Sequence, residues 1–382
     1  MSTSKSRTHN ARTGPSLAPA QPAEVIDFNR RGLFIGGAPK SGTTLLLSLL
    51  DGHPQLVVVP EETQYLEERG RYRALKTPQA RLHHLLHQTE LRVLAHGRFA
   101  PPRECRSLDE RNYAGFQYDR FAALADDLAR RPGMNDSLLF SEMVRAYAEV
   151  SGIDWRKCVR WVEKSTSNEV HTAALDELFP QAKLVQVIRD PRAVFASRKK
   201  RLTRGGALYS KAHRLLRAWN KSAKEISRLH SEPSRFLVVR YEDLVSNPAR
   251  VLKQVCQFGD FDFTDQMLTP TRAGNSWEGN SAFEASFFGI SGSPLRHWRD
   301  YLTPHEIWWV ELHCKKGMRL AGYELVSGAR FSLARWLKRL PRESRAGYFR
   351  ARRASLCHLL GWLHDCRYEC QTRQTIFPEP IL

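Results

Sequence analysis

LFIGGAPKSGTTLLLSLL, residues 33–50, is the stretch that decides the fold of this 382-residue chain. Its first three residues are apolar, as in a strand that is buried on both faces, and two glycines end them. From residue 43 the stretch contains good helix formers and no helix breaker, which predicts a helix over residues 43–50. A strand, a glycine turn and a helix together direct several backbone N–H groups and the positive end of a helix dipole at one spot. The stretch therefore predicts a phosphate-binding loop.

The glycine spacing of this loop is that of a nucleoside-triphosphate loop, because four residues separate Gly37 and Gly42. In the triphosphate pattern a lysine follows the second glycine and reaches the β and γ phosphates. Here Thr43 follows Gly42, and Lys40 stands two residues before the glycine. A cation at that point suits one 5′ phosphate group, and PKSGTT resembles the 5′-phosphosulfate loop of sulfotransferases. The alternative is a tight turn that binds no ligand.

The composition is that of a basic globular protein. The formal net charge is +19, with clusters of Lys and Arg in residues 198–204 and 330–353, and 42% of the residues are hydrophobic. Such a charge attracts an anionic cofactor and nucleic acid alike, so charge alone does not separate these two partners. The longest apolar runs are far shorter than the roughly 18 residues of a transmembrane helix. Residues 1–23 lack the apolar region of a secretory signal, so we expect a cytoplasmic enzyme.

Cysteine usage and composition shifts predict the domain organisation. The seven cysteines are scattered and form no CxxC pair, so we expect neither a zinc site nor a disulfide framework, and no bound metal. We expect three parts: a disordered N-terminal lead (1–30), a catalytic domain (31–327) and a basic helical C-terminal extension (328–382).

The order of predicted elements indicates an α/β fold. Short β-branched or apolar runs at residues 55–59, 158–162, 183–188 and 236–240 predict strands, and helical patterns lie between them. Such alternation predicts a P-loop-like three-layer domain, with a central parallel sheet flanked by helices and with sites at the carboxyl ends of the strands. We interpret the helical patterns within residues 78–150 as an insertion that forms part of an acceptor pocket.

A second anion-binding arrangement follows the strand at residues 183–188. Arg189 comes directly after this strand, Asp190 is the predicted helix N-cap, and Pro191 occupies the first helical position. Ser197 lies two helical turns after Asp190 and on the same face, about 10 Å along the axis. An arginine at the helix mouth and a hydroxyl on that face are suited to hold a dianionic phosphate.

These two segments, in this order, resemble the two signatures of the sulfotransferases that use 3′-phosphoadenosine 5′-phosphosulfate (PAPS). The resemblance covers most of residues 33–298 and includes SGTTLLLSLLDGHP, EET, the lysine after CVRWV, RDPR, RAWN and VVRYEDL. Among the branches of the family it is most similar to the tyrosylprotein and bacterial sulfotransferases.

The resemblance implies site residues. The 5′ phosphosulfate would contact the loop residues Lys40, Ser41, Gly42, Thr43 and Thr44, and the 3′ phosphate would contact Arg189 and Ser197. Glu62 corresponds to the base, with Glu61 as an alternative because the spacing from the loop is one residue longer than expected. Lys164 corresponds to a lysine near the transferring group, and Tyr241 to a residue of the adenine pocket, or else to a core tyrosine. The late loop offers three candidates to complete the site, Ser286, Ser291 and Arg296.

The predicted reaction moves a sulfuryl group from PAPS to an acceptor hydroxyl, or to an amine, without a metal. The acceptor itself stays open between peptide tyrosine, a sugar, a lipid and a small metabolite. Two alternatives remain. One is a nucleotide kinase or triphosphatase that uses the same loop with magnesium. The other is a basic nucleic-acid-binding protein, whose binding would depend steeply on salt.

Overall fold

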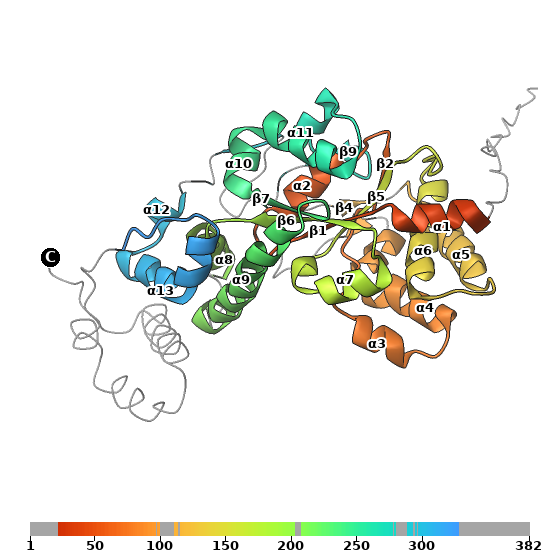
Figure 1. Ribbon diagram of the computed structural model, residues 1–382, viewed down its shortest axis with the longest axis horizontal. Helices are drawn as coiled ribbons and strands as arrows, with labels where there is room; N and C mark the ends of the chain where they lie inside the picture. Colours follow the sequence, from red (N-terminus) through yellow and green to blue (C-terminus); the bar gives the residue numbers. More distant parts are fainter. Residues whose placement is uncertain are drawn as a thin grey trace, which may run out of the picture.

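The computed structural model describes residues 22–96, 98–99, 111–113, 115–202, 208–277, 279, 289–292, 295 and 297–327. Its centre is a five-stranded parallel sheet with the strand order β2-β5-β1-β6-β7. The strands are β1 (Gly32–Gly36), β2 (Leu56–Val58), β5 (Arg160–Lys164), β6 (Lys183–Ile188) and β7 (Phe236–Arg240). The predicted fold class is confirmed, because parallel strands alternate with helices along the chain and helices lie on both sides of the sheet (Figure 1).

The two faces of the sheet carry different helices. On one face, Leu33 and Ile35 of β1 pack with the apolar side of α2 (Thr43–Leu50), and with α10 (Tyr241–Ser246) and α11 (Pro248–Gly259). On the other face, Phe34 packs among aromatic rings that include Trp161 and Phe140. Alternate residues of a strand point to opposite faces, so a strand buried on both sides is apolar throughout. All five residues of β1 are buried, as the sequence predicted.

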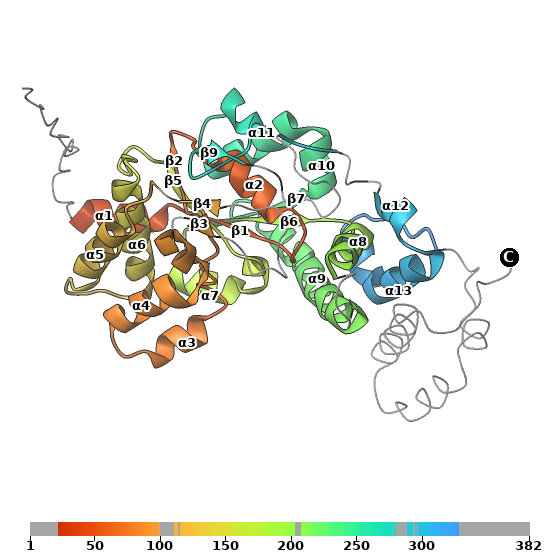
Figure 2. The same cartoon turned by 180° about the vertical axis from the view of Figure 1, so that it is seen from behind.

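The predicted helical insertion lies beside β2 and β5. It consists of α3 (Arg69–Ala74), α4 (Pro78–Gln88), a 3₁₀ turn (Glu90–His96), α5 (Tyr118–Ala129) and α6 (Asp136–Val150), and of the short strands β3 (Arg98–Phe99) and β4 (Arg111–Asn112). Figures 1 and 2 both show these helices at one end of the molecule, next to α7 (Thr172–Leu178). Their apolar faces join the core on the Phe34 side of the sheet.

A second group of helices packs at the opposite end. It contains α8 (Pro191–Leu202), α9 (Leu208–Ser231), α12 (His297–Tyr301) and α13 (Pro304–Leu320) (Figure 1). Gly317 of α13 allows the close approach to α9, because a Cβ there would lie 2.7 Å from the Trp219 ring and 2.8 Å from the Ala223 methyl group. A hairpin of β8 (Thr271–Arg272) and β9 (Asn275–Ser276) returns the chain to α2.

The structure corrects several predicted boundaries. Residues 22–30, expected within the disordered lead, form helix α1 (Pro22–Arg30), whose Phe28 is fully buried and contacts the Trp155 ring. Strand β5 begins and ends two residues later than expected, so Glu163 and Lys164 belong to the strand. Within the predicted insertion, helix α4 ends at Gln88 and the chain continues as the 3₁₀ turn, because Thr89 is extended. The rest of the lead and the C-terminal extension (328–382) lie outside the described residues.

In the part of the chain that the structure describes, no helix is both long enough and apolar enough to cross a bilayer.

Candidate active site

The phosphate-binding loop has the backbone that its glycines predict. Gly37 and Gly42 both have positive φ, 152° and 100°, and Lys40 between them has φ 72°. A side chain at position 42 is also excluded sterically, because a Cβ there would lie 2.2 Å from Cδ2 of Tyr241. Glycine is therefore required at Gly42 both for its conformation and for close contact with the Tyr241 ring.

The same loop leaves polar groups available to an anion. Gly42 is the N-cap of α2 and offers no side-chain cap, so the N–H groups of the first helical turn keep their capacity to bind a ligand. The Ser41 hydroxyl is fully buried and has no hydrogen-bond partner among the described residues. Buried polar atoms are normally paired, and an unpaired one at a helix N-terminus fits a bound phosphate. The residues of this loop therefore fit the 5′ phosphosulfate of PAPS.

The second predicted phosphate segment contacts the first. Arg189 Nη1 donates to the Lys40 carbonyl oxygen at 3.3 Å, although 149 residues separate them. The Arg189 guanidinium also lies over the ring of Tyr241, 4.1 Å from its centroid. Tyr241 thus packs between Arg189 and Gly42. The Nε of Arg189 has no hydrogen-bond partner among the described residues, so this N–H is available to a 3′ phosphate.

Buried charges hold the turn that carries Arg189. Asp190 accepts from the backbone N–H of Arg192 at 2.8 Å, which confirms the predicted N-cap. The Arg192 guanidinium pairs with Asp190 and with Glu311 of α13, both at 2.7 Å. Glu242 accepts from the Asp190 backbone N–H at 2.9 Å. Helices α8, α10 and α13 are therefore joined at this turn, and a buried network of this kind restricts the conformations open to Arg189.

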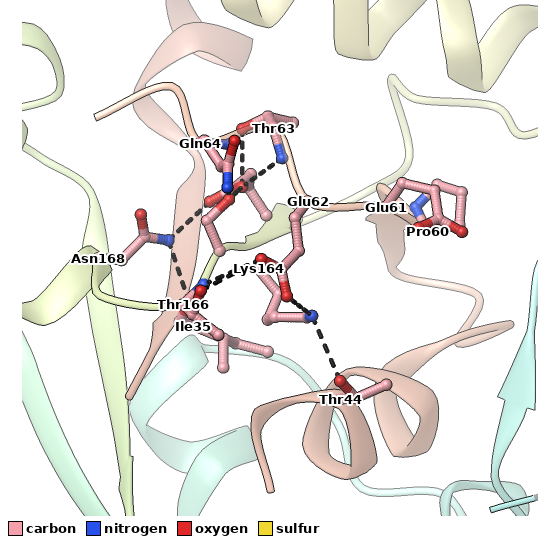
Figure 3. Close-up of polar contacts among 12 residues, drawn as sticks. Ile35, Thr44, Pro60, Glu61, Glu62, Thr63, Gln64, Lys164, Thr166 and Asn168 are labelled. Carbon is pink, nitrogen blue, oxygen red and sulfur yellow. Dashed lines mark hydrogen bonds and ion pairs between the residues drawn. The ribbon is translucent and has the colours of Figure 1, made fainter. Parts of the chain in front are cut away.

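Glu62 and Lys164 form an ion pair at the edge of the phosphate loop (Figure 3). Lys164 Nζ lies 2.6 Å from Glu62 Oε1 and 3.3 Å from the Thr44 hydroxyl oxygen. Glu62 Oε2 accepts from the hydroxyl of Thr166 at 3.3 Å. The Lys164 side chain is only 5% exposed, whereas that of Glu62 is 22% exposed, so the carboxylate is the more accessible partner.

This pair lowers the pKa of Glu62. Burial raises the pKa, but the positive charge of Lys164 and the hydrogen bonds from Lys164 and Thr166 together outweigh burial, and the pKa lies below the ordinary glutamate value. Glu62 is therefore a carboxylate at neutral pH, as a proton acceptor must be.

Glu61 points away from this pair (Figure 3). It is 1% exposed, forms an ion pair with Arg272 at 2.9 Å and accepts a short hydrogen bond from the Tyr113 hydroxyl. These contacts tie β2 to the β8–β9 hairpin and to the insertion. Of the two candidate bases, Glu62 is thus the one that contacts Lys164, and Glu61 belongs to a buried polar cluster.

A cavity of about 570 Å³ lies along the free edge of β2. Leu56 and Val58 of β2 line it together with Tyr113, Phe116 and Tyr147 of the insertion. Tyr113 also contacts Glu61, because its hydroxyl donates a hydrogen bond to the Glu61 carboxylate. The insertion therefore lines a cavity beside β2, and its role as an acceptor pocket stays a prediction.

The remaining predicted residues have different outcomes. Thr43 is buried in the first turn of α2, and Ser197 is buried within α8. Ser286 and Arg296 lie outside the described residues, and Ser291 lies in the short described segment 289–292 and stays a candidate. His53 has local contacts: its Nδ1 accepts from the Gln55 N–H and its Nε2 contacts the Asp262 carbonyl oxygen.

The sequence did not predict that Glu163 and Asn168 lie in one hydrogen-bonded cluster. Glu163 is buried and accepts hydrogen bonds from Thr63, Ser165 and Asn168. Burial raises the pKa of this carboxyl group, although the hydrogen bonds oppose the shift. The available signal was an acidic residue directly after the apolar run CVRWV, in a sequence that suits a buried strand.

The chain is similar in sequence to known proteins. Residues 32–265 match the profile of the Sulfotransferase family. The chain is 26% identical to protein-tyrosine sulfotransferase 2 of Gallus gallus over 239 residues, which cover 62% of this chain and 53% of that protein. It is 25% identical to protein-tyrosine sulfotransferase 1 of Danio rerio over 62% of this chain and 55% of that protein. The chain thus spans about half the length of these two relatives. Among solved structures, the sulfotransferase domain of the Synechococcus PCC 7002 olefin synthase aligns with a TM-score of 0.46 and 23% identity, over 77% of this chain and 94% of that chain.

The family profile covers more than half of the chain, so this chain belongs to the Sulfotransferase family. The resemblance expected from PKSGTT and RDPR, and the enzyme class that follows from it, are confirmed. The kinase alternative has no support in these comparisons.

Proposed function

We propose that this chain transfers a sulfuryl group from PAPS to an acceptor hydroxyl, with Glu62 as the proton acceptor. The observation that carries the proposal is the position of Lys164 Nζ between Glu62 Oε1 and the Thr44 hydroxyl oxygen, at 2.6 and 3.3 Å. This contact joins a carboxylate to helix α2, which follows the phosphate loop. A carboxylate beside an anion site is what an in-line transfer to a hydroxyl needs.

Different residues of the site would have different roles in the transfer. When bound, the donor supplies an activated sulfuryl group and a 5′ phosphate that leaves. Lys40 and the loop N–H groups would stabilise charge on the departing phosphate, and Lys164 would offset charge on the transferring oxygens. Glu62 would take the proton of the acceptor hydroxyl as its oxygen bonds to sulfur. Arg189 and Ser197 would hold the 3′ phosphate and so fix the donor in place.

The acceptor class follows from the relatives only as a proposal. Two of them are named protein-tyrosine sulfotransferases, and carbohydrate sulfotransferase 5 of Mus musculus is 29% identical over 38% of this chain. Tyrosine-containing peptides are therefore the first acceptors to test and carbohydrates the second. A cytoplasmic location and the domain limits 31–327 stay predictions from the sequence.

The test has two stages. In the first, thermal unfolding is measured with 3′-phosphoadenosine 5′-phosphate, the product nucleotide, and with adenosine 5′-phosphate as the matched control. We expect the bisphosphate to raise Tm more than the monophosphate, because at equal concentration the ligand with the lower Kd stabilises the folded state more. In the second, sulfur-labelled PAPS is offered with a panel of tyrosine peptides, sugars and phenols.

Two results would contradict the proposal. The first is magnesium-dependent ATP turnover with no response to the bisphosphate, which is expected of a kinase. The second is steeply salt-dependent binding of DNA or RNA together with indifference to the bisphosphate, which is expected of a nucleic-acid-binding protein.

A further inference from the structure

Glu163 is a buried carboxylate that the proposed mechanism does not use. Its Oε1 accepts from the backbone N–H of Thr63 at 3.3 Å, from the Thr63 hydroxyl at 2.7 Å and from the Ser165 hydroxyl at 2.5 Å. Its Oε2 accepts from the Asn168 amide at 2.7 Å. Four donors thus converge on one side chain that is 1% exposed. Such a cluster restricts every segment that contributes to it.

The contacts of Glu163 and Lys164 hold two consecutive residues of the loop after β2. Successive side chains of a strand point to opposite faces of a sheet, so Glu163 and Lys164 of β5 face opposite ways. Lys164 binds Glu62, and Glu163 binds the next residue, Thr63. The loop is therefore held from both faces of the sheet at the residue proposed as the base.

The same cluster extends to the end of β1. Asn168 donates both to Glu163 and, at 3.0 Å, to the carbonyl oxygen of Ile35, which lies directly before the glycines of the phosphate loop (Figure 3). Gln64, with φ 53°, adopts the left-handed conformation that non-glycine residues rarely occupy. Its N–H donates to the Ser165 hydroxyl at 2.8 Å, and this hydroxyl in turn donates to Glu163. The surrounding contacts thus maintain an uncommon backbone conformation two residues after Glu62.

We propose that Glu163 is a positioning residue that fixes the Glu62 carboxylate relative to Lys164 and the phosphate loop. Glu163 acts through Thr63 and Asn168, and the proposal requires no contact between Glu163 and either PAPS or the sulfuryl acceptor. The inference rests on the proposed function of Glu62, because it assigns Glu163 the task of holding that base. A displacement of about 1 Å in a catalytic group is enough to lower a rate by roughly 100-fold.

The sharpest variant is Thr63→Val, which keeps the shape of the side chain and removes the hydroxyl that binds Glu163. Its matched partner is Thr63→Ser, which retains the hydroxyl. We expect Thr63→Val to lower kcat by about 10-fold to 100-fold, with an unchanged KM for PAPS and an unchanged thermal shift by the product nucleotide. Thr63→Ser should keep at least about half of the wild-type kcat, because its hydroxyl can still donate to Glu163.

Glu163→Gln tests the carboxylate itself. Its side-chain NH₂ group would face donors from Thr63, Ser165 or Asn168, so we expect a larger fall in kcat than for Thr63→Val. Glu142→Gln is the control for the loss of a buried carboxylate, because Glu142 pairs with Arg145 at 2.6 Å within α6 of the insertion. The control should lower Tm and leave kcat as in wild type.

A second measurement does not need turnover. The pKa of the Glu62 carboxylate is followed by NMR in the free protein, where Thr63→Val should raise it toward or above the ordinary glutamate value because the ion pair with Lys164 loosens. Thr63→Ser and Glu142→Gln should leave that pKa unchanged. A wild-type protein that sulfates no acceptor would refute the proposed function while this NMR comparison still tests the positioning role. An unchanged Glu62 pKa in Thr63→Val, or equal loss of kcat in Thr63→Val and Thr63→Ser, would overturn the inference.

Discussion

Replacing Glu62 by glutamine is the substitution that bears most directly on the mechanism. Glutamine keeps an oxygen for the Lys164 ammonium 2.6 Å away but cannot take a proton from the acceptor. General-base catalysis typically contributes about 10²- to 10⁴-fold, so we expect kcat to fall by that factor, which corresponds to about 3–5 kcal/mol. The change also removes the ion pair of the Lys164 ammonium, whose side chain is 5% exposed, so we expect a lower Tm as well.

Glu61→Gln is the matched variant, with the same chemical change one residue earlier. Glu61 is 1% exposed, and its replacement removes the buried ion pair with the Arg272 guanidinium. Breaking a buried ion pair costs about 3–5 kcal/mol, and the remaining hydrogen bond to Tyr113 keeps the expected loss near the lower value. Such a loss lowers Tm by roughly 5–10 °C. We expect turnover within tenfold of wild type, because Glu61 does not contact Lys164.

The assay combines initial rates with sulfur-labelled PAPS and thermal unfolding with and without the product nucleotide. A retained thermal shift in Glu62→Gln would show that the donor site is intact and that the loss lies in the chemical step. The reverse pattern, in which Glu61→Gln loses turnover and Glu62→Gln keeps it, would refute the assignment of the base. Equal loss of nucleotide binding in both variants would mean that the glutamates shape the donor site.

Two further predictions follow from the charges of the site. Because the pKa of Glu62 is lowered in the folded state, its contribution to stability is present above the unfolded-state pKa of about 4.3. That contribution is lost as the pH falls through the folded-state pKa. For the same reason the acidic limb of kcat/KM should lie below about pH 4.3. In Lys164→Met, only the hydrogen bonds from Thr166 still oppose burial, so the limb measured on the residual activity should move to higher pH. An unmoved limb would mean that Lys164 does not set this pKa. Arg189→Ala should weaken binding of the 3′,5′-bisphosphate by about 10-fold to 100-fold, the usual value of a charge-assisted hydrogen bond, with less than threefold effect on adenosine 5′-phosphate. Calorimetry that finds equal losses for both nucleotides would argue against a 3′-phosphate role.

Local sequence was sufficient for the elements that carry the anion sites. Strand β6 and helix α2 have the predicted bounds, and Asp190 is the N-cap of α8. These features depend on neighbours within a few residues: apolar runs, glycine turns and capping side chains. Local pattern failed where packing decides the end of an element, as at β5, which continues to Lys164 because its pairing with β1 does.

The sequence by itself thus predicted the strands, the glycine loop after β1 and the Asp190 N-cap, because each arises from residues that are neighbours in the chain. Only the tertiary structure showed that Glu62 contacts Lys164 whereas Glu61 contacts Arg272, and only it revealed the contacts of Glu163. Both answers depend on which way side chains point at the ends of β2 and β5, two strands about 100 residues apart. That direction is set by the register Val58 to Val162 and by the packing on each face of the sheet, and a slip of one residue would exchange the faces.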